Sequence, residues 1–392
     1  MTIRKRLKSF LTAGFIGATL AGCLGVAGTG IASAADVVDG TSSDPGTADR
    51  AKVIVDTDMG QLNDDAIALF MLTQSSDKVN LLGVTTVAGN TWLEEGTQYT
   101  LRQLQLVGRS DVPVFMGAGE PLMGNRQPVL AAEQALYGNS EYLGSWARER
   151  PESYTALGEA PYGGYAEAEP EDQHAVEFLA EQIRANPKEI TLFALGPATN
   201  IALLARMYPD VVPLVKEVIY MGGAIDIPGN TTPAAEFNWW YDPEAIRIAL
   251  RAPFPKQTVV PNDVAERVYY TKTQYDRIVA GADTPITRMF KDLQGKRWEE
   301  NPDRQTFVWD AITTAIFLDR SIATDVESRY IDVDTTYGPN YGRSIGYHDS
   351  RRRDSDEGKG FPVGTQKVDI VFDIDRDRFW NLYTDLMGAP LP

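Results

Sequence analysis

The sequence predicts an α/β fold, with a mainly parallel, Rossmann-like open sheet that carries helices on both faces. Strand and helix signals alternate along the chain, and each strand signal is an unbroken apolar run, as in strands buried on both faces. Polar or glycine residues follow these runs. Because ligands bind at the carboxyl ends of such strands, we expect the functional site just after Val55, Val87, Ala194 and Met221.

The elements follow in order along the chain. Apolar and β-branched runs predict strands at residues 53–55, 79–87, 111–116, 189–194, 215–221 and 367–375. Apolar residues at helical spacing predict helices at 65–74, 97–107, 175–185, 199–207 and 377–387. Residues 281–306 are polar and partly helical, and residues 338–366 are interpreted as a charged loop. Residues 133–173 break the alternation and are interpreted as an insertion or mobile loop over the site.

The N-terminus carries a targeting segment. Basic residues precede an apolar stretch that ends in a small-x-small site, so residues 1–34 are interpreted as a signal peptide cleaved before Ala35. Residues Leu20 to Cys23 also resemble a bacterial lipobox, and in that alternative Cys23 is lipidated. We therefore expect a secreted protein, with a lipoprotein on the outer face of the bacterial membrane as the alternative. Residues 35–50 are predicted to be a flexible lead-in, and residues 51–392 one domain.

The charge of the chain limits its partners. The formal net charge is −17, and residues 35–392 alone carry −21, because residues 1–34 hold four basic residues and no acid. Such a surface repels phosphate backbones, so we expect no nucleic-acid partner. Contact with a membrane is expected only if Cys23 is lipidated. Cys23 is also the only cysteine, which excludes an intrachain disulfide and a catalytic thiol.

Four acids lie within ten residues of one another at the end of the first strand, namely Asp56, Asp58, Asp64 and Asp65. Packed carboxylates repel one another unless a cation lies among them, and oxygen ligands favour calcium or magnesium. Zinc is disfavoured, because the chain has only two histidines. Two alternatives remain open at this point: the acids cap the next helix, or they belong to a phosphatase of the haloacid-dehalogenase type.

Five segments in a fixed order carry a more specific signal, each at a predicted strand end or loop: Asp56–Ala66, Gly83–Asn90, Ala194–Asn200, Met221–Gly223 and Gly229–Asn238. Together they resemble the nucleoside hydrolase family, often called inosine-uridine-preferring nucleoside hydrolases. The resemblance runs from about residue 52 to 387. It implies that residues 51–392 form a catalytic domain that hydrolyses the N-glycosidic bond of ribonucleosides with the help of calcium, giving ribose and free base.

The resemblance also implies a role for each matching residue. Asp58 and Asp65 match carboxylate ligands of calcium, Leu195 a backbone carbonyl ligand, and Asp310 a late aspartate ligand. Asp58 is also placed to take a proton from the attacking water, as the catalytic base. Five residues match substrate-binding positions. Asp64 and Asn90 match residues near the ribose hydroxyls and the metal, and the residues that match ribose-binding positions are Asn230, Glu236 and Asn238. Asp56 is expected to be structural. A homo-oligomer is possible, since family members often form one.

The chain departs from the family on the side of the base. Many members have a histidine before the late aspartate, where this chain has Trp309, as in the purine-preferring branch. An indole that stacks on a purine raises its basicity, so Trp309 favours a purine-leaning enzyme. The alternative is that Trp309 is a core residue. Segment 131–146 lacks the usual histidine, and Tyr137, Tyr142 or Trp146 could stack on the base instead, with packing against the protein as the alternative. Of Trp239 and Trp240, one is expected to pack and the other to line the pocket.

A function of another class competes with the enzyme. A nucleoside- or ribose-binding protein would keep the pocket and lack turnover. The set of Asp58, Asp65, Asp310 and Asn238 argues against that loss. The leading interpretation is therefore a calcium-dependent nucleoside hydrolase that acts on small-molecule nucleosides.

Overall fold

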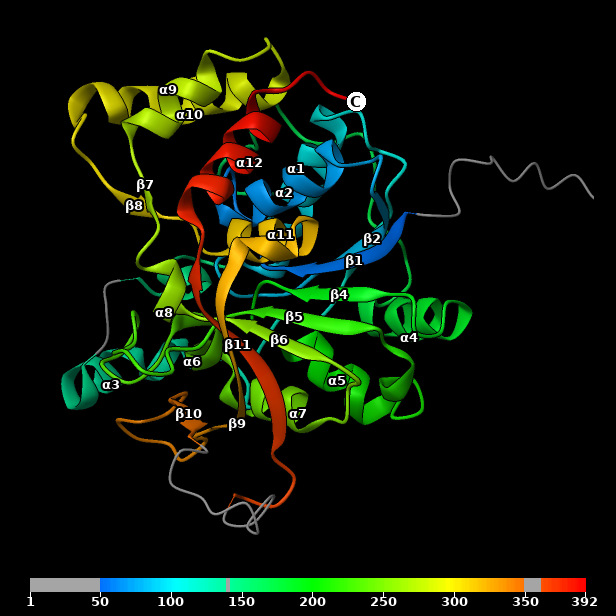
Figure 1. Ribbon diagram of the computed structural model, residues 1–392, viewed down its shortest axis with the longest axis vertical. Helices are drawn as coiled ribbons and strands as arrows, with labels where there is room; N and C mark the ends of the chain where they lie inside the picture. Colours follow the sequence, from blue (N-terminus) through cyan, green and yellow to red (C-terminus); the bar gives the residue numbers. More distant parts are fainter. Residues whose placement is uncertain (1–49, 139–141, 349–360) are drawn as a thin grey trace, which may run out of the picture. The chain divides into compact units, whose positions relative to one another are not determined.

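A computed structural model describes residues 50–138, 142–348 and 361–392, and the predicted signal peptide, Cys23 and residues 35–49 lie outside them. The described chain forms a nine-stranded sheet with the order β10-β9-β11-β6-β5-β4-β1-β2-β3 (Figure 1). Its strands are β1 (Ala51–Thr57), β2 (Val79–Thr86), β3 (Val114–Met116), β4 (Thr191–Ala194), β5 (Glu217–Met221), β6 (Gln257–Val260), β9 (Ala323–Val333), β10 (Ser344–Tyr347) and β11 (Gln366–Ile374).

The sheet is parallel from β3 across to β11, and only β9 and β10 run antiparallel to their neighbours. This arrangement confirms the predicted mainly parallel sheet. Parallel strands need crossover connections, which here carry the helices of both layers. A separate two-stranded sheet pairs β7 (Tyr269–Tyr270) with β8 (Thr306–Phe307).

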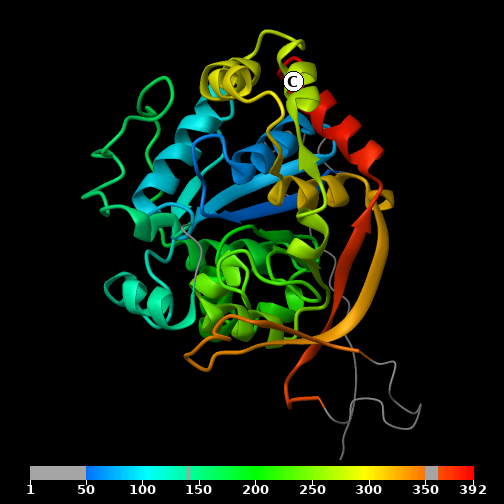
Figure 2. The same ribbon diagram turned by 90° about the vertical axis from the view of Figure 1, so that its left-hand side faces the viewer.

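Helices cover both faces of the sheet (Figures 1 and 2). Strand side chains alternate between the faces, so Val53 and Val55 join one core while Ile54 joins the other. The first core packs against α1 (Asp64–Gln74), α2 (Leu93–Leu106), α9 (Lys272–Val279), α10 (Pro285–Glu300), α11 (Asp310–Leu318) and α12 (Arg376–Gly388). The second packs against α4 (Ala175–Ala185), α5 (Thr199–Met207) and α7 (Pro243–Arg251).

Most predicted elements are present. The helices expected at 175–185 and 199–207 have those bounds, and the strand expected at 111–116 begins only at Val114, because Val112 bonds back to Arg109 in a turn. The prediction of a loop throughout 338–366 was wrong for Ser344–Tyr347, which pairs with β9; residues 349–360 lie outside the described chain. Strands β6 and β9 were not predicted.

Residues 133–173 form no separate sheet within their described part. They contain most of α3 (Leu130–Tyr137) and a short 3₁₀ helix at Gly144–Ala147, and the remainder is mostly irregular. Arg102 of α2 donates to the backbone oxygens of Tyr162 and Gly163, which holds the later half against that helix. No helix among the described residues combines the length and apolar character that crossing a membrane requires.

Candidate active site

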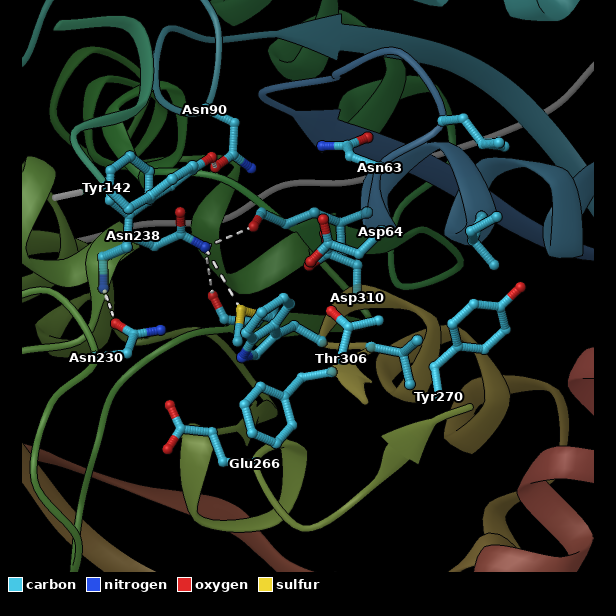
Figure 3. Close-up of a pocket in the computed structure, with 18 of the residues that line it drawn as sticks. Asn63, Asp64, Asn90, Tyr142, Asn230, Asn238, Glu266, Tyr270, Thr306 and Asp310 are labelled. Carbon is cyan, nitrogen blue, oxygen red and sulfur yellow. Dashed lines mark hydrogen bonds between the residues drawn. The ribbon is translucent and has the colours of Figure 1, made fainter. Parts of the chain in front are cut away.

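A cavity of about 690 Å³ opens at the carboxyl ends of the central strands (Figure 3). Sequence-predicted residues line it from five separate segments: Asp64, Asn90, Leu195, Asn230, Glu236, Asn238, Trp309 and Asp310. Asp58 and Asp65 lie beside these residues and are fully buried. The fold therefore brings the predicted residues together at the edge where parallel sheets bind ligands.

The acid cluster is built where β1 leads into α1. Asn63 is the N-cap of α1, and its side-chain oxygen accepts from the amide of Ala66 at 3.2 Å. This cap leaves the carboxylates of Asp64 and Asp65 free for another role, so the capping alternative does not explain them. Asp64, Asp65 and Asp310 each offer one oxygen, and these oxygens lie within 4.8 Å of one another. The structure therefore adds Asp64 to the candidate metal ligands.

Asp58 interacts with the carboxylate of Asp65. It accepts hydrogen bonds from the backbone amide of Asn90 at 2.6 Å and from the Asn90 side chain at 3.3 Å. Asp65 accepts from the Thr57 hydroxyl in a short hydrogen bond and from Asn63 Nδ2 at 2.7 Å. These bonds hold both carboxylates in a fixed orientation.

Asp56 points elsewhere. Its carboxylate accepts from the Thr85 hydroxyl at 2.5 Å and from Asn200 Nδ2 at 2.7 Å, and it does not line the cavity. These bonds tie β1 to β2 and to the start of α5. The structure therefore places Asp56 in a supporting position, as the sequence predicted.

Burial raises the pKa of Asp58 and of Asp310 well above the usual range, and neighbouring carboxylates raise them further. Burial also raises the pKa of Asp65, and it raises that of Asp64 to about 7, with the charge of Asp65 adding to the shift. Ionising all four acids therefore requires a compensating positive charge.

A calcium ion fits the residues present. The available donors are all oxygen atoms, which hard cations prefer. Asp310 Oδ1 is buried and has no hydrogen-bond partner within the described parts of the chain. An unpaired buried carboxylate oxygen is costly, and a cation would satisfy it.

The end of the cavity that the sequence predicts to bind ribose, here called the sugar end, is formed by residues in and before α6 (Phe237–Tyr241). Glu236 caps α6 and accepts from the amides of Asn238 at 2.8 Å, Gly223 at 2.9 Å and Trp239 at 3.1 Å. Asn230 Oδ1 accepts from the amide of Phe237 at 3.0 Å. These bonds hold the cavity-lining segment in one conformation.

Asn238 connects the sugar end to the strand ends. Its Nδ2 donates to the carbonyl oxygen of Leu195 at 2.7 Å and to that of Met221 at 3.2 Å (Figure 3). Its Oδ1 is buried and finds no partner in the described chain. The Leu195 carbonyl, a predicted metal ligand, is thus at the cavity and is held by a predicted ribose-binding residue.

Trp309 lines the cavity and also packs against the first core. Phe307 lies edge-on to its ring at 5.6 Å, and Trp309 Nε1 is buried without a partner in the described residues. Trp309 therefore has features of both interpretations, because it lines the pocket and also contacts the core. The expectation that Trp239 or Trp240 lines the pocket was wrong: both rings are buried in apolar cores, and Phe237 occupies the cavity wall instead.

The three aromatic candidates of segment 131–146 separate in space. Tyr142 lines the cavity, and its hydroxyl donates to Asn90 Oδ1 at 2.5 Å. Trp146 stacks on Tyr241 with ring centroids 4.2 Å apart and is buried, and Tyr137 packs edge-on against Tyr337. Of the three, only Tyr142 lines the cavity.

Sequence reasoning missed a second part of the cavity lining. It comes from residues in or next to α8 (Asn262–Ala265), β7, α10 and β8, and its polar residues are Glu266, Tyr270, Gln294, Arg297, Arg304 and Thr306. No motif marks these positions. The sequence indicated α10, which carries two of them, only as part of a polar and partly helical stretch. His174 and His348 do not line the cavity; His174 caps α4 instead.

The chain is similar to known proteins over most of its length. The sequence profile described as inosine-uridine preferring nucleoside hydrolase matches residues 53–381. The pyrimidine-specific ribonucleoside hydrolase RihB of Escherichia coli O17:K52:H18 is 31% identical over 85% of this chain and 96% of its own length. An uncharacterized protein of Schizosaccharomyces pombe is 33% identical over 71% of this chain and 85% of its own.

Solved structures share the fold. A plant nucleoside hydrolase, PpNRh1, has a TM-score of 0.70 at 24% identity, covering 87% of this chain and 99% of its own. A purine-preferring ribonucleoside hydrolase from Gardnerella vaginalis has a TM-score of 0.66 at 23% identity, covering 86% and 98%. The matched profile spans most of the chain, including the acid cluster and the sugar end of the cavity. The chain therefore belongs to the inosine-uridine preferring nucleoside hydrolase family, whose activity is the hydrolysis of the N-glycosidic bond of ribonucleosides.

Proposed function

We propose that the protein is a calcium-dependent ribonucleoside hydrolase with a preference for purine nucleosides. One observation carries the proposal: Asp64 and Asp310, which form a group of three carboxylates with the buried Asp65, line the same cavity as the amide and carboxylate side chains of Asn230, Glu236 and Asn238. This combination offers a cation site directly beside hydrogen-bonding groups suited to sugar hydroxyls.

Asp65 and Asp310 would hold the ion, together with Asp58, the Leu195 carbonyl and, from its position, Asp64. A calcium ion bound there would lower the pKa of a coordinated water and bind ribose hydroxyls. Asp58 is the proposed base, because it matches the family position that takes the proton of the attacking water and its carboxylate is buried beside the acids that would hold the ion. Asn90 keeps Asp58 oriented for that proton transfer.

The sugar end is proposed to stabilise the transition state. Breaking the C1′–N bond leaves positive charge on the ribosyl ring, and the carboxylates that line the cavity provide compensating negative charge. Asn238 and Asn230 are already fixed by hydrogen bonds, so little side-chain entropy is lost when they bind the sugar.

The purine preference rests on Trp309, which presents an indole to the cavity near Asp310. Stacking would hold a purine and make its protonation easier in a site where no histidine lines the cavity. RihB, the relative from Escherichia coli, is described as pyrimidine-specific, so base preference needs a direct measurement in this chain.

The experiment is an assay of ribose release from inosine, guanosine, uridine and cytidine, with and without a calcium chelator. We expect ribose and free base in equal amounts, faster with purines, and no reaction in chelator or in Asp58→Ala. Saturable nucleoside binding without ribose would contradict hydrolysis and support a binding protein. Activity that resists the chelator would contradict the calcium requirement.

Export is proposed from the N-terminal sequence, in which basic residues, an apolar stretch and a small-x-small site precede Ala35. Expression of the full chain in a bacterial host, followed by mass analysis, tests this. A mature protein that begins at Ala35 in the medium is expected. A detergent-soluble product modified at Cys23, and lost in Cys23→Ala, would support the lipoprotein instead.

A further inference from the structure

Tyr142 is an exposed aromatic residue whose hydroxyl and ring both make contacts with the protein. The residue is 54% exposed and lines the cavity. Its hydroxyl donates to Asn90 Oδ1 at 2.5 Å, and its ring lies edge-on to Phe237 with centroids 5.1 Å apart. In Figure 3, Tyr142 lies between Asn90 and the asparagines of the sugar end. It therefore links the acid cluster to the wall that is proposed to bind ribose.

The hydroxyl of Tyr142 and the two carboxylates support the same orientation of the Asn90 amide. A phenol hydroxyl that donates selects the amide oxygen as its acceptor, so the amide nitrogen turns toward the acids. Asn90 Nδ2 then lies 3.3 Å from Asp58 Oδ1 and 3.4 Å from Asp65 Oδ2. The reversed amide would place its oxygen against two carboxylates. Tyr142 therefore favours the one orientation in which Asn90 supports the acid cluster.

Residues 142–148, here called the clasp, hold this arrangement in place. The amide of Ser145 donates to the carbonyl oxygen of Gly89 at 2.8 Å, and Arg148 donates to that of Asn90 at 2.9 Å. Together with the bond from the Tyr142 hydroxyl, these hydrogen bonds join the clasp to Gly89 and Asn90. The clasp is fixed in turn by the Ser145 hydroxyl, which lies 2.9 Å from the hydroxyl of Tyr241.

Gly144 shows how closely the clasp approaches its neighbours. It has a φ of +57°, and a Cβ atom there would lie 2.4 Å from the oxygen of Gly89 and 2.5 Å from the ring of Phe237. Only glycine fits this backbone and this space. The clasp is therefore packed against both sides of the site at the point where Tyr142 enters it.

We propose that Tyr142 is a positioning residue of the active site, which orients Asn90 for the acid cluster and the sugar through its hydroxyl. The inference rests on the proposed ribose-binding function of the cavity. Its ligand is the ribose part of the nucleoside, because Asn90 and the sugar-end asparagines lie on either side of Tyr142.

The test compares Tyr142→Phe with a matched control, Tyr337→Phe. Tyr337 is 55% exposed and also donates one hydrogen bond, to Glu133 at 3.0 Å, but it does not line the cavity. We expect Tyr142→Phe to lower kcat/KM for inosine about tenfold, the size of one lost hydrogen bond, and Tyr337→Phe to change it less than about twofold. D-ribose binding, measured by calorimetry with calcium present, should weaken in Tyr142→Phe alone.

A double-mutant cycle with Asn90→Ala separates positioning from packing. If Tyr142 acts through Asn90, adding Tyr142→Phe to Asn90→Ala should change D-ribose affinity by less than about twofold. Losses that multiply in the double variant, or a Tyr142→Phe protein that binds D-ribose like the Tyr337→Phe control, would overturn the proposal. A wild-type protein that binds D-ribose yet hydrolyses no nucleoside would instead overturn the proposed reaction, and the binding cycle would still judge Tyr142.

Discussion

Asp65 and Asp310 lie in the first turns of two different helices, α1 and α11, yet their carboxylate oxygens lie within 4.8 Å of each other. Each carboxylate lies in the first turn of its helix, where the helix dipole favours negative charge. The two helices pack side by side in the same layer (Figure 1). The cation site therefore forms only when the sheet and both helices are assembled, and ion binding should stabilise the whole fold.

Replacing Asp310 with asparagine is expected to weaken calcium binding by at least about tenfold, because ligand charge controls calcium affinity. Calcium should also raise the melting temperature of this variant less than that of the wild type. Asp377→Asn is a matched control, since Asp377 is an exposed acid in the first turn of α12. Calorimetric titration measures both affinities, and equal values for Asp310→Asn and wild type would refute the site.

Trp309→Ala should reduce kcat/KM for inosine by about tenfold or more, and that for uridine less, because a purine offers the larger surface for stacking. Steady-state rates for the two substrates in one preparation provide the measurement, and each substrate serves as a control for the other. Equal losses for both nucleosides would show that Trp309 supports the cavity without selecting the base.

Stability in chelator should fall as pH rises from about 5 to 8. Burial raises the pKa of Glu236 and of Asp64 to about 7 and that of Asp242 to about 6, from ordinary values of 4.5, 3.8 and 3.8. The pKa values of Asp58, Asp65 and Asp310 are raised as well, so in chelator these acids act in the same direction. The folded protein thus keeps protons that the unfolded chain has already released, so their stabilising effect is complete below about pH 4 and is lost through pH 6 to 7. About 1.4 kcal/mol accompanies each tenfold change in an acid constant.

Urea unfolding at several pH values measures this effect. Acids with lowered pKa, such as Glu217 and Asp111, titrate below their ordinary values and leave the interval unaffected. A free energy of unfolding that rises between pH 5 and 8 in chelator would show that the buried acids with raised pKa values do not control the dependence.

Arg126→Met is expected to destabilise the fold by about 3 kcal/mol, because it leaves the buried Glu133 carboxylate without its cation. The guanidinium bonds Glu133 at 3.2 Å and lies within 5.1 Å of the ring centroids of Trp146, Trp240 and Tyr341. The double variant Arg126→Met/Glu133→Leu should recover part of the loss. Urea unfolding of the wild type and the two variants measures the free energies of unfolding. An Arg126→Met protein as stable as the wild type would contradict this role of Arg126.

The sequence allowed most of the parallel strands and several residues of the candidate site to be predicted, because both depend on local patterns. Helices α4 and α5 have regular apolar spacing, and their bounds were predicted to the residue. Strand β9 was missed because residues 323–328 are mostly exposed and polar, and it becomes a strand by pairing with β10 and β11. Long-range pairing of this kind leaves little trace in local sequence.

The site shows the same division. Motifs identified Asp58, Asp65 and Asp310, but the closeness of Asp64 to Asp310 depends on how α1 packs against α11. Tyr142 was one of three aromatic candidates in its segment. Tyr142 reaches the cavity because Gly144 packs closely against Gly89 and Phe237. The spacing of residues in the sequence does not reveal this packing.

The measurement that tests the account most directly compares two calcium titrations of the wild-type protein, one following ribose release from inosine and the other following heat of binding. If the carboxylates of Asp65 and Asp310 hold the ion on which hydrolysis depends, the two curves should share one midpoint, and Asp310→Asn should shift both together. Full activity without calcium, or a rate that saturates where no calcium binds, would contradict it.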